Sequence, residues 1–69
     1  MSDLDDRLLA AHAAGDQWGL VGLYAEAADQ ANCVDAACFF LTQAYIYGLE
    51  LAHPSVPALH ARLDAEGRV

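Results

Sequence analysis

Basic residues are scarce in this chain. Three lysines and arginines together stand against ten aspartates and glutamates, which gives a formal net charge of −7. Nucleic acids and anionic membrane surfaces attract basic patches, so this balance argues against both as partners. A basic protein partner is compatible with the charge, but the charge also has the simpler role of keeping an apolar domain in solution.

Cysteine is equally sparse. Two cysteines cannot build a disulfide-rich scaffold. The N-terminal segment MSDLDDRLL lacks the basic region followed by an apolar region that marks a secretory signal. We therefore expect a cytoplasmic protein in which both thiols are reduced.

The chain is also short. Its 69 residues make a single domain, 1–69, and a chain of this size buries only about 60% of its unfolded surface. Hydrophobic residues form 57% of the sequence, which argues against disorder. Without disulfides, efficient helix packing and self-association are the remaining routes to stability.

Motifs of catalysis are missing as well. The sequence has no Gly-rich phosphate loop, nucleophile elbow, HExxH helix or calcium loop. The side chains that could act as nucleophiles or metal ligands are Cys33, Cys38, His12, His53 and His60. The two cysteines are spaced more widely than a C-x2-C zinc knuckle, and a proline separates the last two histidines, so they do not share one helix face.

We therefore expect a protein that is not an enzyme and has no catalytic residue, no cofactor and no metal. Two alternatives stay open. One is a small metal- or ligand-binding regulatory protein that uses these histidines and cysteines. The other is an accessory subunit of a larger enzyme.

Four helices are predicted, because β-branched residues are few and Gly and Pro fall where helices would end. The expected N-cap residues are Ser2, Asp16, Asp35 and Ser55. Gly15 suits the left-handed backbone that follows the first helix, and Gly67 ends the fourth. The third helix should end near Ala52, because Pro54 restricts the residue before it, and Pro57 is tolerated in the first turn of the fourth.

The segment from residue 36 to residue 54 is apolar almost all the way round. A membrane span needs about 20 mainly apolar residues. Here polar residues interrupt every such window, and no basic flank sets an orientation. Two adjacent apolar stripes run along the segment: Ala36, Phe40, Ala44, Tyr47 and Leu51, and beside them Ala37, Leu41, Tyr45 and Gly48. We expect a central helix that packs on more than one side.

Phe39 and Ile46 lie one heptad apart, inside the narrow polar strip of this helix. Large exposed apolar patches usually mark interaction sites, and a two-fold dimer needs only one self-complementary patch. We therefore predict a homodimer interface formed by Phe39, Ile46 and Tyr47. The alternative is that the first or the fourth helix covers these residues within one chain.

Trp18 lies on the polar side of the second predicted helix, near its start. Tryptophan is enriched at binding hot spots, so Trp18 is a further candidate for partner binding. Packing against the end of a neighbouring helix is the alternative.

Two parts of the chain resemble helical repeats. GDQWGLVGLYAEAADQA is similar to the second helix of a tetratricopeptide unit, with Gly15-Asp16 as the turn between helices and Tyr24 at a packing position. LYAEAADQA followed by ACFFLTQAYIYG resembles a Sel1-type repeat, and the matching residues are Ala27, Ala28, Ala37, Leu41, Tyr45 and Gly48. Thr42 departs from the pattern, which usually has glycine there.

The resemblance covers about the middle half of the chain and implies an antiparallel helix-hairpin scaffold for protein contacts. The expected fold is thus all-α, a compact array of four helices in two antiparallel hairpins. The expected function is a non-enzymatic protein–protein interaction module that self-associates. A further, unidentified protein partner is also possible.

Overall fold

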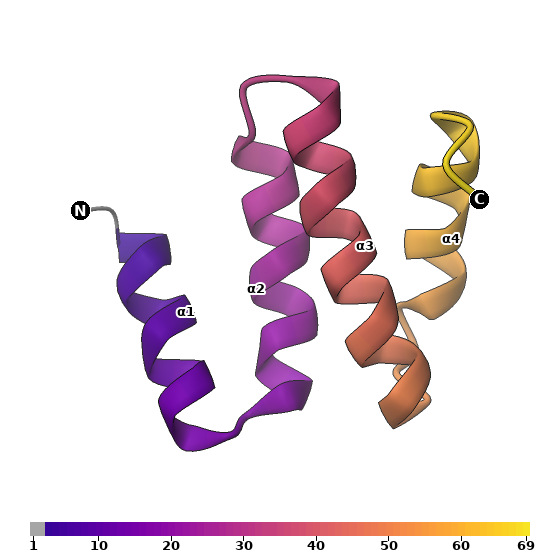
Figure 1. Cartoon of the computed structure of the whole chain (residues 1–69). Helices are drawn as coiled ribbons and strands as arrows, with labels where there is room; N and C mark the ends of the chain where they lie inside the picture. Colours follow the sequence, from indigo (N-terminus) through magenta and orange to yellow (C-terminus); the bar gives the residue numbers. More distant parts are fainter. Residues whose placement is uncertain (1–2) are drawn as a thin grey trace.

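A computed structural model describes residues 3–69 and confirms the all-α fold. The helices are α1 (Asp3–Ala14), α2 (Gln17–Gln30), α3 (Val34–Leu51) and α4 (Val56–Ala65). Consecutive helices run antiparallel and lie side by side in chain order, so that α3 stands between α2 and α4 (Figure 1). The main contacts join α1 to α2, α2 to α3, and α3 to α4.

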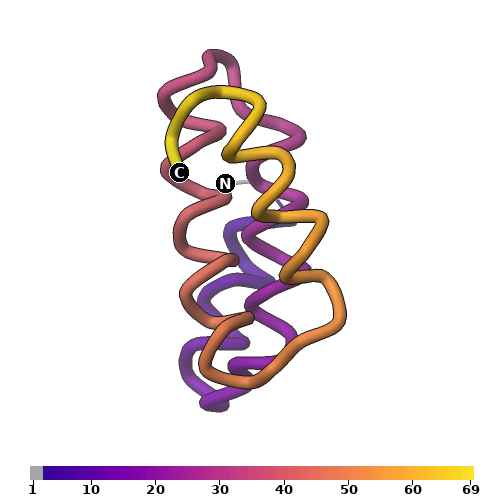
Figure 2. Tube along the Cα trace, turned by 90° about the vertical axis from the view of Figure 1, so that its right-hand side faces the viewer, coloured from indigo at the N-terminus to yellow at the C-terminus, as the bar shows by residue number. Residues whose placement is uncertain are grey.

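The row of helices is thin. The Cα atoms extend over 32 × 28 × 12 Å, so the array is less than half as deep as it is long or wide. Seen from its α4 side, the molecule is correspondingly narrow, with the helix axes all close to vertical (Figure 2). Because the row is thin, a helix within it keeps a strip of surface that its neighbours do not cover.

The turn between α1 and α2 agrees with the sequence prediction. Gly15 adopts a left-handed backbone with φ of 67°, and the Asp16 N–H donates to the Ala11 carbonyl at 2.9 Å, as in a Schellman motif. The Asp16 carboxylate then accepts a hydrogen bond from the Gly19 N–H at 3.0 Å and caps α2. The predicted cap at Ser2 lies outside the described residues.

The predicted cap of the third helix is wrong. The N-cap of α3 is Cys33, whose extended backbone (φ −147°, ψ 163°) ends the turn two residues before Asp35. Asp35 therefore lies inside the first turn of the helix, where its negative charge is favoured by the helix dipole. The Cys33 side chain makes no capping hydrogen bond to any described residue.

Ser55 occupies the N-cap position of α4 as predicted, but within residues 3–69 its side chain makes no capping hydrogen bond. The Ser55 hydroxyl lies instead 2.8 Å from Nδ1 of His53, to which the Ser55 backbone N–H also donates. Pro57 lies in the first turn of α4 and Gly67 follows its end, both as predicted.

The uncapped start of α3 leads to a prediction. Cys33→Ser should raise the free energy of unfolding by about 0.5–1 kcal/mol, because serine at an N-cap accepts a hydrogen bond from a free backbone N–H. Urea denaturation followed by circular dichroism measures the change, and Cys33→Ala is the matched control without a capping oxygen. A serine variant no more stable than the alanine variant would contradict the cap assignment.

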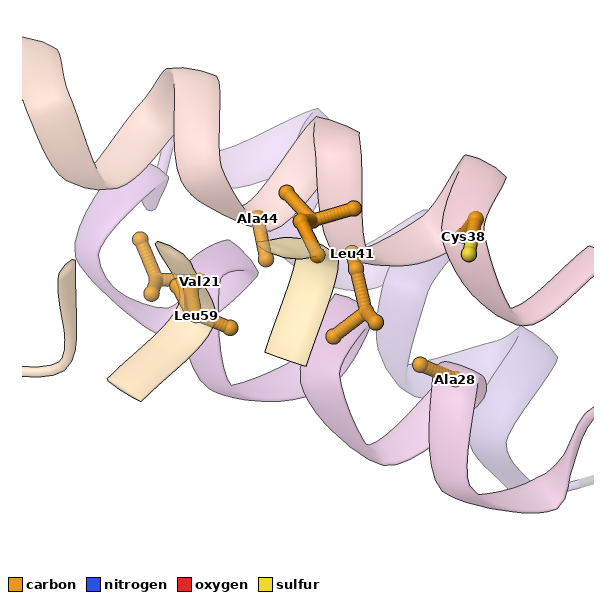
Figure 3. Close-up of a cluster of buried hydrophobic side chains, with 7 residues drawn as sticks. Val21, Ala28, Cys38, Leu41, Ala44 and Leu59 are labelled. Atoms are coloured by element: carbon orange, nitrogen blue, oxygen red, sulfur yellow. The ribbon is translucent and has the colours of Figure 1, made fainter. Parts of the chain in front are cut away.

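The main core lies between α2, α3 and α4 (Figure 3). It consists of seven buried residues: Val21, Ala28, Cys38, Leu41, Ala44, Leu59 and Leu63. The prediction that the third helix is central and packs on more than one side is therefore confirmed. The spacing of the second helix predicts an apolar face of Leu20, Leu23, Tyr24, Ala27 and Ala31. Val21 and Ala28 lie outside this face, and they are buried because α2 contributes to the α3–α4 side as well as to the α1 side.

Candidate interaction surface

The side of α3 that faces away from the core carries three exposed large apolar side chains. Phe39 is 59% exposed, Ile46 is 46% exposed and Leu49 is 54% exposed. Together with two polar residues they follow the alternating i+4 and i+3 spacing of a coiled-coil seam. We call this set the outer stripe: Asp35, Phe39, Thr42, Ile46 and Leu49.

The polar members of the outer stripe are already hydrogen-bonded. The Thr42 hydroxyl donates to the Cys38 carbonyl at 2.8 Å, within its own helix. Asp35 accepts a hydrogen bond from the Arg68 guanidinium at 2.5 Å, and this bond raises the pKa of Arg68. Burying a polar group is costly only when it loses its partners, so Thr42 does not oppose the approach of an apolar partner.

The structure excludes one of the two sequence-based interpretations of Phe39 and Ile46, the one in which another helix of the same chain covers them. Neither side chain is covered by α1 or α4, since both remain about half exposed or more. The alternative of an intrachain cover is therefore wrong for both residues. Phe39 touches one aromatic neighbour, Phe40, edge to face at 5.6 Å between ring centroids.

Tyr47 lies elsewhere. Its ring stacks on Tyr24 at a centroid distance of 6.0 Å and an interplanar angle of 11°, and it also contacts His12. Leu49 occupies the outer stripe instead, although the sequence-based prediction of the interface did not include it. The spacing contained the signal, because Leu49 follows Ile46 by three residues and so continues the heptad pattern.

An aromatic cluster joins α1, α2 and α3 beside this region. Tyr24 stacks on Phe40 as well as on Tyr47, and its hydroxyl lies 2.9 Å from Nε2 of His12. Desolvation raises the pKa of Tyr24, and the neighbouring Tyr47 raises it further. The cluster holds Tyr47 half-buried, on a different side of α3 from Phe39.

Trp18 packs where the alternative interpretation placed it. Its ring centroid lies 4.3 Å from that of His53, at the turn between α3 and α4. The side chain nevertheless stays 54% exposed. Trp18 thus contacts a neighbouring helix terminus and still offers surface to a partner.

The histidines and cysteines do not gather. His12 contacts Tyr24, His53 contacts Trp18, and His60 contacts Tyr45 at 5.8 Å. Cys33 is exposed at the start of α3, and Cys38 is buried in the core. Within residues 3–69 no group of three or more His, Cys, Asp or Glu side chains is arranged to hold a metal ion.

Open grooves lie between the described helices. The larger of two such grooves, of about 450 Å³, has mainly apolar walls from α1, α2 and α3 that include Leu8, Ala27 and Phe40. The smaller, of about 230 Å³, lies between α3 and α4 beside Cys38 and Leu41. Both linings are mainly apolar, with Asp5 and Cys33 at the larger groove and Arg62 and Glu66 at the smaller one.

Comparisons of the chain with models of protein families, with curated proteins and with solved structures give no match. None of the helices between residues 3 and 69 combines the length and the apolar character that crossing a bilayer requires. The case for an interaction surface therefore rests on the exposure and spacing of the outer stripe.

Proposed function

We propose that this protein is a non-enzymatic protein–protein interaction module that forms a homodimer through the outer stripe of α3. The observation that supports the proposal is the simultaneous exposure of Phe39, Ile46 and Leu49 on one helix face. Large apolar side chains that are exposed together on one face often mark an interaction site, whereas singly scattered ones are ordinary. A helix face that binds its own copy satisfies two-fold symmetry without a second surface.

The small size of the patch indicates a weak interface. One helix face buries less than the roughly 800 Å² per partner of a standard interface, and interfaces at this low end are typical of weak, transient encounters, so we expect a dissociation constant on the order of micromolar. Self-association also fits the small size of the chain, because added burial stabilises a domain whose own core is limited.

The resemblance to helical repeats agrees with the proposal. Of the residues that carry it, Ala27, Ala28, Leu41 and Gly48 are buried, while Ala37 and Tyr45 are half-buried. Repeat units of this type form scaffolds for protein contacts. A chain with too few units to be stable alone gains stability when it packs against a neighbouring molecule. Membership of the tetratricopeptide/Sel1-like group and a cytoplasmic location stay predictions.

The proposal predicts that the double variant Phe39→Glu, Ile46→Glu is a monomer. Two carboxylates on each copy would have to be desolvated at the interface, which costs far more than the apolar contacts contribute. Light scattering should give the mass of a dimer for the parent and of a monomer for the variant, while circular dichroism shows unchanged helicity.

The matched control is Leu9→Glu, Ala13→Glu, which adds the same charge at exposed positions of α1. We expect this control to keep the mass of the parent. A parent that is monomeric at concentrations up to hundreds of micromolar, well above the expected dissociation constant, would refute the dimer. A control that dissociates as completely as the α3 variant would show that net charge, and not the outer stripe, governs association.

A further inference from the structure

The outer stripe also specifies how the second copy is oriented. We infer that two α3 helices pack antiparallel, with the two-fold axis crossing them level with Ala44, so that Phe39 of each copy packs on Leu49 of the other. This inference rests on the proposed homodimer, and it adds the direction and the register of the helix pair.

The register follows from the spacing of the apolar residues. They occupy the part of the stripe from Phe39 to Leu49, and the midpoint of this part is level with residue 44. Turning a second copy about that midpoint places Phe39 opposite the partner's Leu49 and Thr42 opposite the partner's Ile46. Each of these outer-stripe positions of one helix then meets an outer-stripe position of the other, as seam packing between two helices requires.

The apolar overlap decides which antiparallel register is preferred. Centring the pair on Thr42 would place Asp35 opposite the partner's Leu49 and thus bury a carboxylate beside a leucine. Centring it level with Ala44 leaves Asp35 beyond the apolar contact, and its side chain is 86% exposed in the single chain. Because desolvating a charge is expensive, the second register is favoured.

Charge decides between the antiparallel and the parallel pair. In a parallel pair each acidic residue of α3 meets its own copy, Asp35 against Asp35 and Glu50 against Glu50, and like charges at one level repel. In the antiparallel pair each Asp35 lies instead within about 4.5 Å, along the axis, of the partner's Glu50, at 1.5 Å per residue. Two carboxylates therefore share each end in either arrangement, and the place of Arg68 beside them decides between the two.

The Arg68 ion pair adds a favourable contact in the same arrangement. Arg68 is held on Asp35 at the N-terminal end of α3. In the antiparallel pair this end lies beside the C-terminal end of the partner's helix, which carries Glu50. Opposite charges therefore share each end of the helix pair, whereas the parallel pair collects the carboxylates of two Glu50 residues at one end.

Disulfide trapping tests the orientation. Phe39→Cys and Leu49→Cys are each made in a Cys33→Ser background, and Cys38 is left in place because it is buried. In the antiparallel pair, two copies of residue 39 are about 15 Å apart along the axis. A disulfide requires Cα atoms within about 7 Å, so neither variant can link to itself.

A 1:1 mixture of the two variants, by contrast, should oxidise to a linked heterodimer in at least several-fold excess over either homodimer. Ala13→Cys in the same background is the control on α1, and it should stay unlinked whether alone or mixed. The experiment is run at protein concentrations where light scattering shows the parent to be dimeric.

The outcomes separate the two proposals. Linking of each variant to itself as readily as to the other, with a dimeric parent, would overturn the antiparallel orientation and leave the homodimer standing. A monomeric parent would overturn both. Heterodimers formed in excess by the mixture, together with an unlinked Ala13→Cys control, support the antiparallel orientation and the register centred level with Ala44.

Discussion

Leu41→Ala should lower the free energy of unfolding by about 2–5 kcal/mol, the usual range for truncating a buried leucine. Leu41 is only 3% exposed and lies in the core cluster between α2, α3 and α4. A small domain has a total stability on the order of 5 kcal/mol. The variant should therefore be close to unfolded at room temperature.

Urea denaturation followed by far-ultraviolet circular dichroism measures this loss, at one fixed protein concentration because dimer stability depends on concentration. The control is Leu9→Ala, since Leu9 is 62% exposed on α1. A surface truncation of this kind changes stability by about 0.5 kcal/mol or less. A Leu41→Ala protein whose free energy of unfolding in urea is within about 0.5 kcal/mol of the parent's would mean that the core-facing side of α3 is misassigned.

Gly48→Val should be the second strongly destabilising change. Gly48 is buried where α3 meets α4, and a Cβ atom placed there would lie 2.9 Å from Cγ2 of Val56 and 3.7 Å from Cβ of His53. Val56 is β-branched and has little rotamer freedom, so it cannot turn away. Overpacking of this kind costs typically about 1–3 kcal/mol, and the chain also has to separate α3 from α4.

Gly22→Val is the matched control for this substitution. Gly22 is exposed in α2, and a Cβ atom there would meet no atom of the described chain within 4 Å. Valine is a somewhat better helix former than glycine, so the control should be neutral or slightly stabilising. Equal stability of the two valine variants in thermal denaturation would show that α3 and α4 do not approach closely at Gly48.

The sequence is sufficient to predict the four helices because their ends depend on local chemistry. Gly15 and Gly67 permit the left-handed backbone that ends a helix, and Pro54 restricts the residue before it, so these ends depend little on neighbours in space. The two apolar stripes of the third helix likewise indicate its central place, since only a helix packed on two sides can bury both.

The details that differ from the sequence prediction depend on packing between helices. Val21 and Ala28 are buried because α4 contributes to the same cluster. The residue pattern of the second helix alone does not indicate this packing of α4 beside α2. Tyr47 is held on a different side of α3 from Phe39 and Ile46 by its contacts with Tyr24 and His12. Residue type alone favours Asp35 as a cap, whereas the backbone at Cys33 decides where the helix begins.

The candidate site is only partly predictable for the same reason. The spacing places Phe39 and Ile46 in a polar strip, but only the packing of the helices shows that neither α1 nor α4 covers them. Leu49 continues the same heptad spacing, whereas the place of Tyr47 depends on its contacts with Tyr24 and His12, which three-dimensional packing sets. Membership of the helical-repeat group remains a prediction from the sequence.

The arrangement of the helices in a row has a kinetic consequence. Most contacts join helices that follow one another in the chain, so the native topology requires few closures of long loops. Proteins with such low contact order fold in microseconds to milliseconds. The monomer should thus fold faster than two copies meet at micromolar concentration, because association proceeds at about 10⁵–10⁷ M⁻¹s⁻¹. Assembly would then begin from preformed α3 helices, and its rate would be set by encounter.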